Sequence, residues 1–169
     1  MTDKPNVYIS GPMTGIADYN YPAFRDAEKR LLAAGFAVHN PAWIGAHDEW
    51  DAWDYRTAGL RAMETMQETH GASKCAVALL PGWRPSFGCL LEVALASRLG
   101  WFVGEIEGVL KSLGDVRRFC PFAAPADLIA NVEERLEQSE HERHSYLCGR
   151  ALDECRQALD ALTGKGANK

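Results

Sequence analysis

Short apolar runs alternate with longer stretches of helical periodicity along the first two thirds of the chain. Apolar, β-prone runs at 7–9, 36–39, 75–80 and 101–104 predict four strands, and the first three are followed by Ser, Asn or Pro residues that favour turns. The segments between them, at 22–34, 54–69 and 87–99, predict helices. Strands that alternate with helices favour a parallel sheet covered on both faces. The pattern therefore predicts an α/β fold, a flavodoxin-like or Rossmann-like three-layer sandwich.

The first predicted helix carries start and stop signals at its two ends. Pro22 suits a first turn, Phe24, Ala27 and Leu31 recur at i+3 and i+4 spacing, and Gly35 stands where a helix commonly ends. The strand that follows ends at an Asn-Pro pair. Together with the first strand, this segment predicts a βαβ unit.

The segment 43–53 is rich in Trp, Asp and Gly and predicts a loop. Its aromatic side chains could form a lid over a ligand, or they could cover the edge of the sheet, which is the simpler role. In the helix that follows, Leu60, Met63 and Met66 share one side, and ordinary packing explains them better than a ligand site does.

Beyond residue 105 the chain becomes more charged and predominantly helical in pattern. A chain of 169 residues that is 47% hydrophobic can bury one good core. We therefore expect one α/β domain over residues 1–110 and a helical C-terminal extension over residues 111–169.

The charge and the cysteine content argue against several classes of function. A formal net charge of −5 without strongly basic runs argues against nucleic-acid binding. No apolar run approaches the roughly 18 residues of a membrane span, and the first residues are polar, so we expect a cytoplasmic protein without membrane contact. Five cysteines without a CxxC pair fit reduced thiols rather than disulfides.

The stretch 76–96 joins a buried strand, a Pro-Gly-containing loop and a buried helix. Ligands of open α/β sheets bind at such a strand-to-helix corner. Glu92 is out of place there, because its i±3 and i±4 neighbours are all small or apolar: Gly88, Cys89, Leu95 and Ala96. Burial of an unpaired carboxylate costs several kcal/mol or raises its pKa. Glu92 is thus either a working group, a residue on the edge of a partly exposed helix, or the partner of a base such as Arg98 in a structural ion pair.

Three separated motifs carry a family resemblance. They are the Tyr-Ile-Ser-Gly-Pro-Met segment at 8–13, the Gly-Phe-x-Val-x-Asn-Pro segment at 35–41, and Leu-Pro-Gly-Trp at 80–83 followed by Ser86, Gly88 and Glu92. Their sequence and order resemble the nucleoside 2-deoxyribosyltransferase-like family, especially its small phage and bacterial members. The resemblance covers residues 6 to 105.

This resemblance implies that Glu92 attacks the anomeric carbon of a 2-deoxyribonucleoside or its 5′-monophosphate and expels the base, by hydrolysis or by base exchange. It implies that Tyr8 lies beside this carboxylate, although Tyr8 could also be a plain core aromatic. The expected substrate-binding residues are Ser10, Gly11, Pro12, Asn40, Ser86, Gly88 and Arg84, with Arg25 as a second possible phosphate ligand. Ser86 could equally be a helix N-cap. No metal or cofactor is implied, and the expected partner is a small nucleoside or nucleotide.

The chain departs from the family pattern at two expected aspartates. Cys75 stands where one often precedes the third strand, and residues 57–60 lack the other, which follows a Tyr-x-Arg segment. Such an aspartate would help to protonate the leaving base. Asp51, Asp54 or Glu64 could substitute for it. A non-catalytic nucleotide-binding module of the same fold is therefore the alternative function.

The tail carries a stripe of His and Cys residues at helical spacing: His141, His144, Cys148 and Cys155. These side chains can bind zinc, but one straight helix seldom offers three or four ligands to one ion. A packing surface or a homodimer face is the simpler interpretation of the stripe, and we expect a homo-oligomer.

Overall fold

A computed structural model of the protein describes residues 4–44 and 52–112. Four strands form one parallel sheet in the order β2-β1-β3-β4. Their bounds are Asn6–Ser10 for β1, Ala37–His39 for β2, Cys75–Leu79 for β3 and Phe102–Glu105 for β4. The predicted parallel α/β fold is confirmed. The predicted C-terminal extension beyond residue 112, with its His and Cys stripe, lies outside the described residues.

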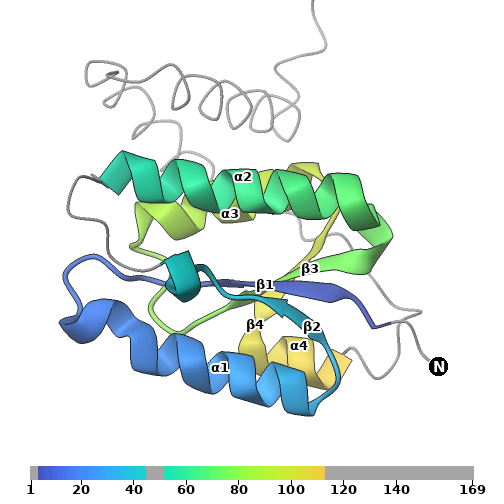
Figure 1. Ribbon diagram of the computed structural model, residues 1–169, viewed down its shortest axis with the longest axis horizontal. Coiled ribbons are helices and arrows are strands. Elements are labelled where there is room, and N and C mark those ends of the chain that lie inside the picture. The colour runs from blue at the N-terminus through green and yellow to red at the C-terminus, as the bar shows by residue number, and fades with distance from the viewer. Residues whose placement is uncertain (1–3, 45–51, 113–169) are drawn as a thin grey trace, which may run out of the picture.

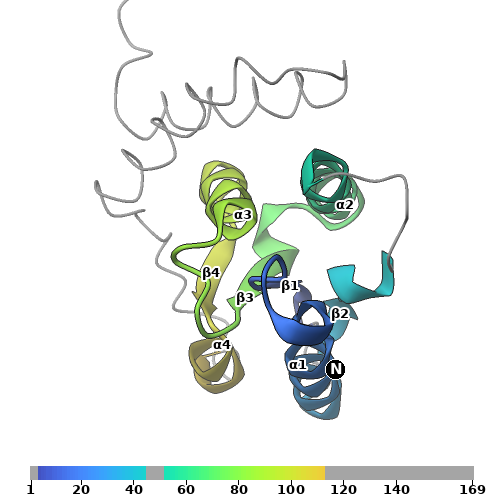
Figure 2. The same ribbon diagram turned by 90° about the vertical axis from the view of Figure 1, so that its left-hand side faces the viewer.

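Helices cover both faces of the sheet, which gives the three layers seen in Figures 1 and 2. One face carries α1 (Tyr21–Ala33) and α4 (Ile106–Ser112). The other carries α2 (Ala52–His70) and α3 (Phe87–Arg98). Three short 3₁₀ turns complete the described part: η1 (Ala17–Asn20), η2 (Pro41–Ile44) and η3 (Ala72–Lys74). None of the described helices is both long enough and apolar enough to cross a membrane.

The predicted end signals of α1 are confirmed. Pro22 lies in its first turn, and Gly35 follows the C-cap with a left-handed φ of 84°, a conformation that glycine adopts without steric cost. Phe24, Ala27 and Leu31 are buried against the sheet. The sequence pattern therefore identified both the helix and its buried side.

The loop predicted over residues 43–53 is partly wrong. The side-chain oxygen of Asn40 accepts a 3.0 Å hydrogen bond from the backbone N–H of Ala42, which turns the chain into η2 directly after β2. Trp43 in this turn is 69% exposed, and its Nε1 donates to Glu28 of α1 at 2.8 Å. At the other end of the segment, α2 already begins at Ala52. Residues 45–51 lie outside the described part.

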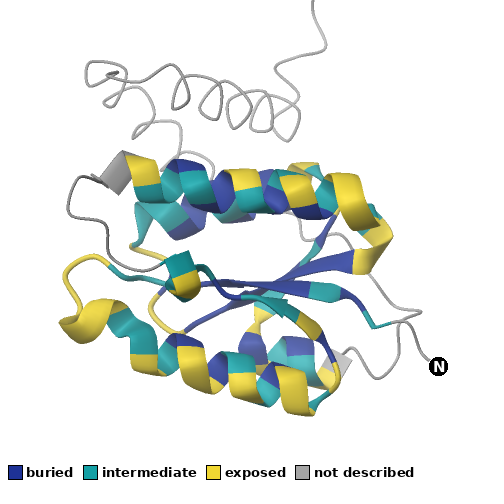
Figure 3. Cartoon of the chain, in the orientation of Figure 1, coloured by how far each residue is buried: buried dark blue, intermediate teal, exposed yellow. Residues whose placement is uncertain are grey.

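Strand side chains alternate between the two faces, and this alternation positions the site. Val7 and Ile9 belong to the apolar cluster under α1 and α4. Tyr8 lies in the cluster under α2 and α3, with Val77 and Leu79 of the neighbouring strand. Successive residues of a strand point to opposite faces, so Tyr8 and Ser10 both face α2 and α3. Figure 3 shows how fully the central strands are buried.

Candidate functional site

Two hydroxyl groups of β1 converge on the carboxylate of Glu92. The Tyr8 hydroxyl donates to Oε1 at 2.7 Å, and Ser10 Oγ donates to Oε2 at 2.5 Å. Tyr8 and Ser10 share a face because they are two residues apart on one strand, and Glu92 reaches them from the second turn of α3. The structure therefore brings together three of the residues that the sequence singled out, at the carboxyl edge of the sheet.

The structure does not contain the alternative ion pair between Glu92 and Arg98. Arg98 is exposed in the last turn of α3. Across residues 4–44 and 52–112, the polar contacts of the Glu92 carboxylate are with the hydroxyls of Tyr8 and Ser10. Glu92 itself keeps part of its surface accessible to solvent. It is thus a hydroxyl-bound carboxylate on a partly exposed residue.

Burial sets the electrostatics of this group of side chains. Burial raises the pKa of Glu92 to about 7, and the hydrogen bonds from Ser10 and Tyr8 oppose that rise because they favour the ionised form. Burial, followed by the nearby Glu92 charge, raises the pKa of Tyr8 well above 10 and that of Cys89 to about 12. Tyr8 therefore remains a hydrogen-bond donor at neutral pH, while Glu92 titrates near neutral pH.

Gly59 of α2 is a part of the site that the sequence did not single out. A Cβ at this position would lie 2.8 Å from Glu92 Oε1 and 2.8 Å from the Tyr8 hydroxyl, closer than real Cβ atoms come to other atoms. The missing side chain therefore makes room for the pair. A glycine inside a helix costs about 1 kcal/mol relative to alanine, and that local cost is the signal that could have identified it.

Ser86 is the N-cap of α3, the structural role that the sequence analysis considered beside substrate binding. It has extended backbone angles, and its Oγ accepts a hydrogen bond from the backbone N–H of Cys89 at 3.5 Å. A Cβ on Gly88 would come 3.7 Å from Arg56 Cγ, an ordinary contact distance. The steric argument is therefore much weaker for Gly88 than for Gly59.

Among the arginines, Arg56 lies next to the start of α3. Its guanidinium carbon is 5.1 Å from the centroid of the Phe87 ring, and its stem approaches Gly88. Arg84 is exposed and lies over the Trp83 ring at 4.8 Å, and Arg25 is exposed on α1. Arg84 and Arg25 are the two arginines that the sequence analysis named as possible phosphate ligands, whereas Arg56 of α2 was not singled out.

The loop after β1 packs tightly against the loop after β3. A Cβ on Gly11 would lie 2.7 Å from Leu80 Cδ1 and 3.0 Å from Leu80 Cβ, so the close contact excludes a larger residue. Pro12 lies near Gly82, 3.7 Å from the position of a Cβ there. Both predicted residues are at the expected edge, where they shape the backbone around the Ser86 loop.

Asn40 is at the expected edge but its side chain is turned to the other face. Its Nδ2 donates to Glu28 Oε2 of α1 at 3.1 Å, while its side-chain oxygen holds η2. Its polar atoms are therefore used by the fold. His39, one residue earlier, faces the opposite way and pairs in register with Tyr8. The two rings stack with centroids 5.5 Å apart and an interplanar angle of 11°.

The expected carboxylate partner of Glu92 is absent from the described part of the site. Cys75 lies at the amino end of β3, opposite Asn6, and its Sγ donates to the Met66 carbonyl oxygen, so position 75 is remote from Ser10. Asp54 and Glu64 are each five residues from Gly59, about 140° around the helix, and thus face away from Glu92. Asp51 is outside the described residues.

Metal ligation finds no support in the described ranges, where no group of three or more His, Cys, Asp or Glu residues is placed to hold an ion.

Comparisons with curated proteins and with solved structures gave no match. The sequence does match the family described as "Domain of unknown function (DUF4406)", over residues 5–104. This match spans more than half of the chain and contains every strand of the sheet, except the last residue of β4, together with Tyr8, Ser10, Gly59 and Glu92. The protein belongs to the DUF4406 family.

Proposed function

We propose that the protein cleaves the N-glycosidic bond of a 2-deoxyribonucleoside or its 5′-monophosphate, with Glu92 as the nucleophile. The observation that carries this proposal is the hydroxyl-bound carboxylate, in which Tyr8 and Ser10 each donate to one oxygen of Glu92. It lies at the carboxyl edge of a parallel sheet, where open α/β folds bind their ligands. The sequence resemblance to nucleoside 2-deoxyribosyltransferase-like proteins supplies the substrate class.

The geometry suits a carboxylate nucleophile. An ionised carboxylate has about four lone-pair positions, and the two hydroxyls use one on each oxygen. The remaining lone pairs are available to the anomeric carbon of a bound sugar. The negative charge stabilises an oxocarbenium-like transition state before the bond forms. Tyr8 and Ser10 hold the carboxylate in one orientation, which reduces the entropy lost on reaching that state.

A 5′-phosphate could be bound at the start of α3. The helix N-terminus offers backbone N–H groups beside the Ser86 hydroxyl, and the Arg56 guanidinium lies over the adjacent Phe87 ring. This arrangement favours a monophosphate over a bare nucleoside. Hydrolysis needs only a path for water to the anomeric carbon, and Glu92 is a partly exposed residue, so we favour hydrolysis over base exchange.

A second candidate function is a nucleotide-binding module without catalysis. The observation in its favour is that the polar partners of Glu92 in the described part are two hydroxyls, without a second carboxylate among them. Such a module would bind a deoxyribonucleotide without releasing its base.

The experiment incubates the protein with a panel of deoxyribonucleosides and their 5′-monophosphates and measures free base. We expect base release by the wild-type protein and none by Glu92→Gln. Glu68→Gln, which changes an exposed glutamate of α2, should keep full activity. Binding of a nucleotide without base release would favour the binding module, and unchanged turnover in Glu92→Gln would remove Glu92 from the mechanism. Addition of a free acceptor base distinguishes hydrolysis from base exchange, because base exchange yields a new deoxynucleoside faster than free sugar.

A further inference from the structure

His39 occupies a distinctive position beside the Tyr8–Glu92 pair. It is the last residue of β2, an edge strand, and the parallel register sets it opposite Tyr8 on the same face of the sheet. One face of its ring is covered by the Tyr8 ring at 5.5 Å. The side chain is only partly buried. Its position thus combines a fixed orientation with access to solvent.

The ring nitrogens of His39 are not used by the described part of the fold. No residue within 4–44 and 52–112 forms a hydrogen bond with either ring nitrogen. In that part of the chain, the fully buried polar atoms without a partner do not include the nitrogens of His39. Asn40, the adjacent residue, is by contrast fully engaged with α1 and η2. An imidazole that is oriented by stacking and free at its nitrogens can exchange a proton with a bound molecule.

The proposed reaction needs such a group. When the anomeric carbon bonds to Glu92, the electron pair of the broken glycosidic bond goes to a nitrogen of the base. An unprotonated purine or pyrimidine anion is a poor leaving group, so a proton must be delivered to the base as it departs. Glu92 cannot deliver it while acting as the nucleophile, and Tyr8 stays protonated because of its raised pKa.

We propose that His39 is the acid–base catalyst of this reaction, an inference that rests on the proposed function. Its imidazolium gives a proton to the departing base, which leaves as the neutral molecule, while Glu92 forms the covalent bond to the sugar. In the second step the neutral imidazole takes a proton from water, the water oxygen bonds to the anomeric carbon, and Glu92 leaves as a carboxylate. Both residues return to their starting forms, so protons and electron pairs balance.

The titratable groups around His39 are few in the described part. Tyr8 of β1 contacts it, and Glu92 and Cys89 of α3 lie beyond Tyr8. The partly buried titratable residues of α2 are Tyr55, Arg56 and Glu64, and Glu28 of α1 is on the opposite face of the sheet. Burial lowers the pKa of His39, and burial raises that of Glu92 to about 7. Catalysis by ionised Glu92 and protonated His39 should therefore show a bell-shaped pH profile, with Glu92 and His39 as the two titrating groups.

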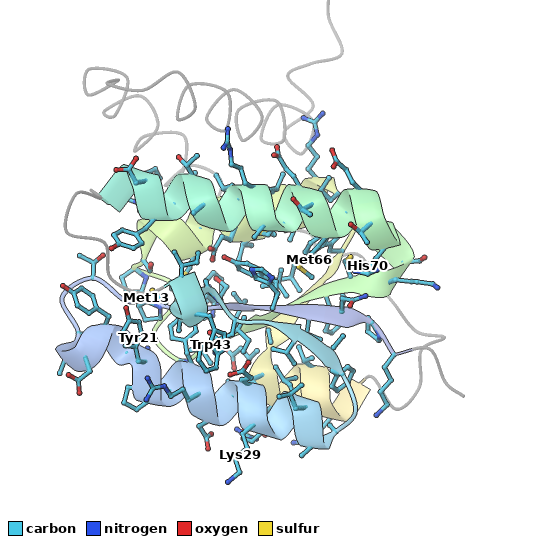
Figure 4. All side chains as sticks on the ribbon, viewed as in Figure 1. Met13, Tyr21, Lys29, Trp43, Met66 and His70 are labelled. Atoms are coloured by element: carbon cyan, nitrogen blue, oxygen red, sulfur yellow. The ribbon has the colours of Figure 1, made fainter. Side chains whose placement is uncertain are left out.

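The test compares two leaving groups in the His39→Gln variant. Natural deoxynucleotides need protonation of the base, whereas 4-nitrophenyl 2-deoxyriboside releases a stable phenolate without it. We expect His39→Gln to lose about 10²-fold or more in kcat/KM on the natural substrate and less than tenfold on the nitrophenyl substrate. His70→Gln is the matched control, since His70 is exposed at the far end of α2 (Figure 4) and should leave both activities unchanged.

The pH profile gives a second readout that a purely structural role would not change. In the wild-type protein kcat/KM should fall above about pH 7, and in His39→Gln this alkaline decrease should disappear, leaving a rate that rises with ionisation of Glu92. Equal losses on both substrates with an unchanged pH profile would overturn the role of His39 while leaving that of Glu92 intact. Absence of base release by the wild-type protein would overturn both proposals.

Discussion

Tyr8 and Glu92 are 84 positions apart in the chain, yet their side chains form a hydrogen bond of 2.7 Å across the boundary between the sheet and α3. The Tyr8 ring has no exposed surface, and its hydroxyl is directed to the carboxylate. This bond favours the ionised form of Glu92 against the effect of burial. Tyr8 therefore affects the proposed reaction by stabilising the negative charge of Glu92.

Replacement of Tyr8 by Phe should raise the pKa of Glu92 further, because one of its two hydroxyl donors is lost. We expect the acidic limb of the kcat/KM profile to move to higher pH and activity at pH 7 to fall at least tenfold, with a loss of about 1–2 kcal/mol in unfolding free energy. Tyr19→Phe is the control, because Tyr19 is 56% exposed. A profile that stays in place would show that the Tyr8 hydroxyl does not tune the carboxylate.

The raised pKa of Glu92 should also make stability pH-dependent. The folded protein holds this proton with a pKa of about 7, against an ordinary value of 4.5. The folded state thus binds more protons between these values, and the free energy of unfolding falls as pH rises from about 4.5 to 7, by up to roughly 3 kcal/mol. Glu92→Gln removes this dependence.

Urea unfolding at pH 5 and pH 8 checks this expectation. Relative to the wild-type protein, Glu92→Gln should be more stable at pH 8 than at pH 5. Glu68→Gln should have the stability of the wild-type protein at both pH values. Equal stability differences for Glu92→Gln at the two pH values would contradict a buried, titrating carboxylate.

Gly59→Ala should harm activity even though alanine favours helices. The added Cβ would lie 2.8 Å from both Glu92 Oε1 and the Tyr8 hydroxyl, so the pair has to move. We expect at least a tenfold loss of activity and no net gain in stability. Gly108→Ala is a matched control in α4, where a Cβ meets nothing within 4 Å, and it should stabilise the protein by up to about 1 kcal/mol. Full activity of Gly59→Ala would show that the site tolerates displacement.

Ser86→Ala should separate the capping role from a role in binding. Loss of the cap on α3 should cost about 1 kcal/mol in thermal or urea unfolding. If Ser86 also binds a 5′-phosphate, KM should rise more for the monophosphate than for the nucleoside. Ser73→Ala, at an exposed residue of η3, should change neither quantity. A rise in KM that is equal for both substrates would leave only the capping role.

The fold could be predicted because its four strands and the helices α1, α2 and α3 each carry a local signal. Strand ends were placed to within about one residue: β2 begins at Ala37 rather than at residue 36, and β4 begins at Phe102 rather than at 101. Glu92 could be identified for a similar reason, since a carboxylate among small and apolar neighbours is visible in the sequence alone. The role of Tyr8 beside it came from the family resemblance.

The remaining site residues depend on how separate elements meet. Gly59, His39 and Arg56 come from α2 and β2, and no sequence spacing relates them to Glu92. Asn40 was predicted at the site, and it does lie at the correct edge, but a strand reverses its side-chain direction at every residue. The one-residue difference between His39 and Asn40 therefore decides which side chain lies on the Tyr8 face of the sheet, and it follows from the register with β1.

The alternation of β1 leaves the molecule with two chemically independent sides. Tyr8 and Ser10 serve one side, while Val7 and Ile9 serve only the apolar layer beneath α1 and α4. Lys29, exposed on the outer surface of α1, belongs to the side without the carboxylate (Figure 4). A cysteine introduced there could carry a fluorophore or a surface tether, and the attached group would be separated from any bound nucleotide by the full thickness of the sheet.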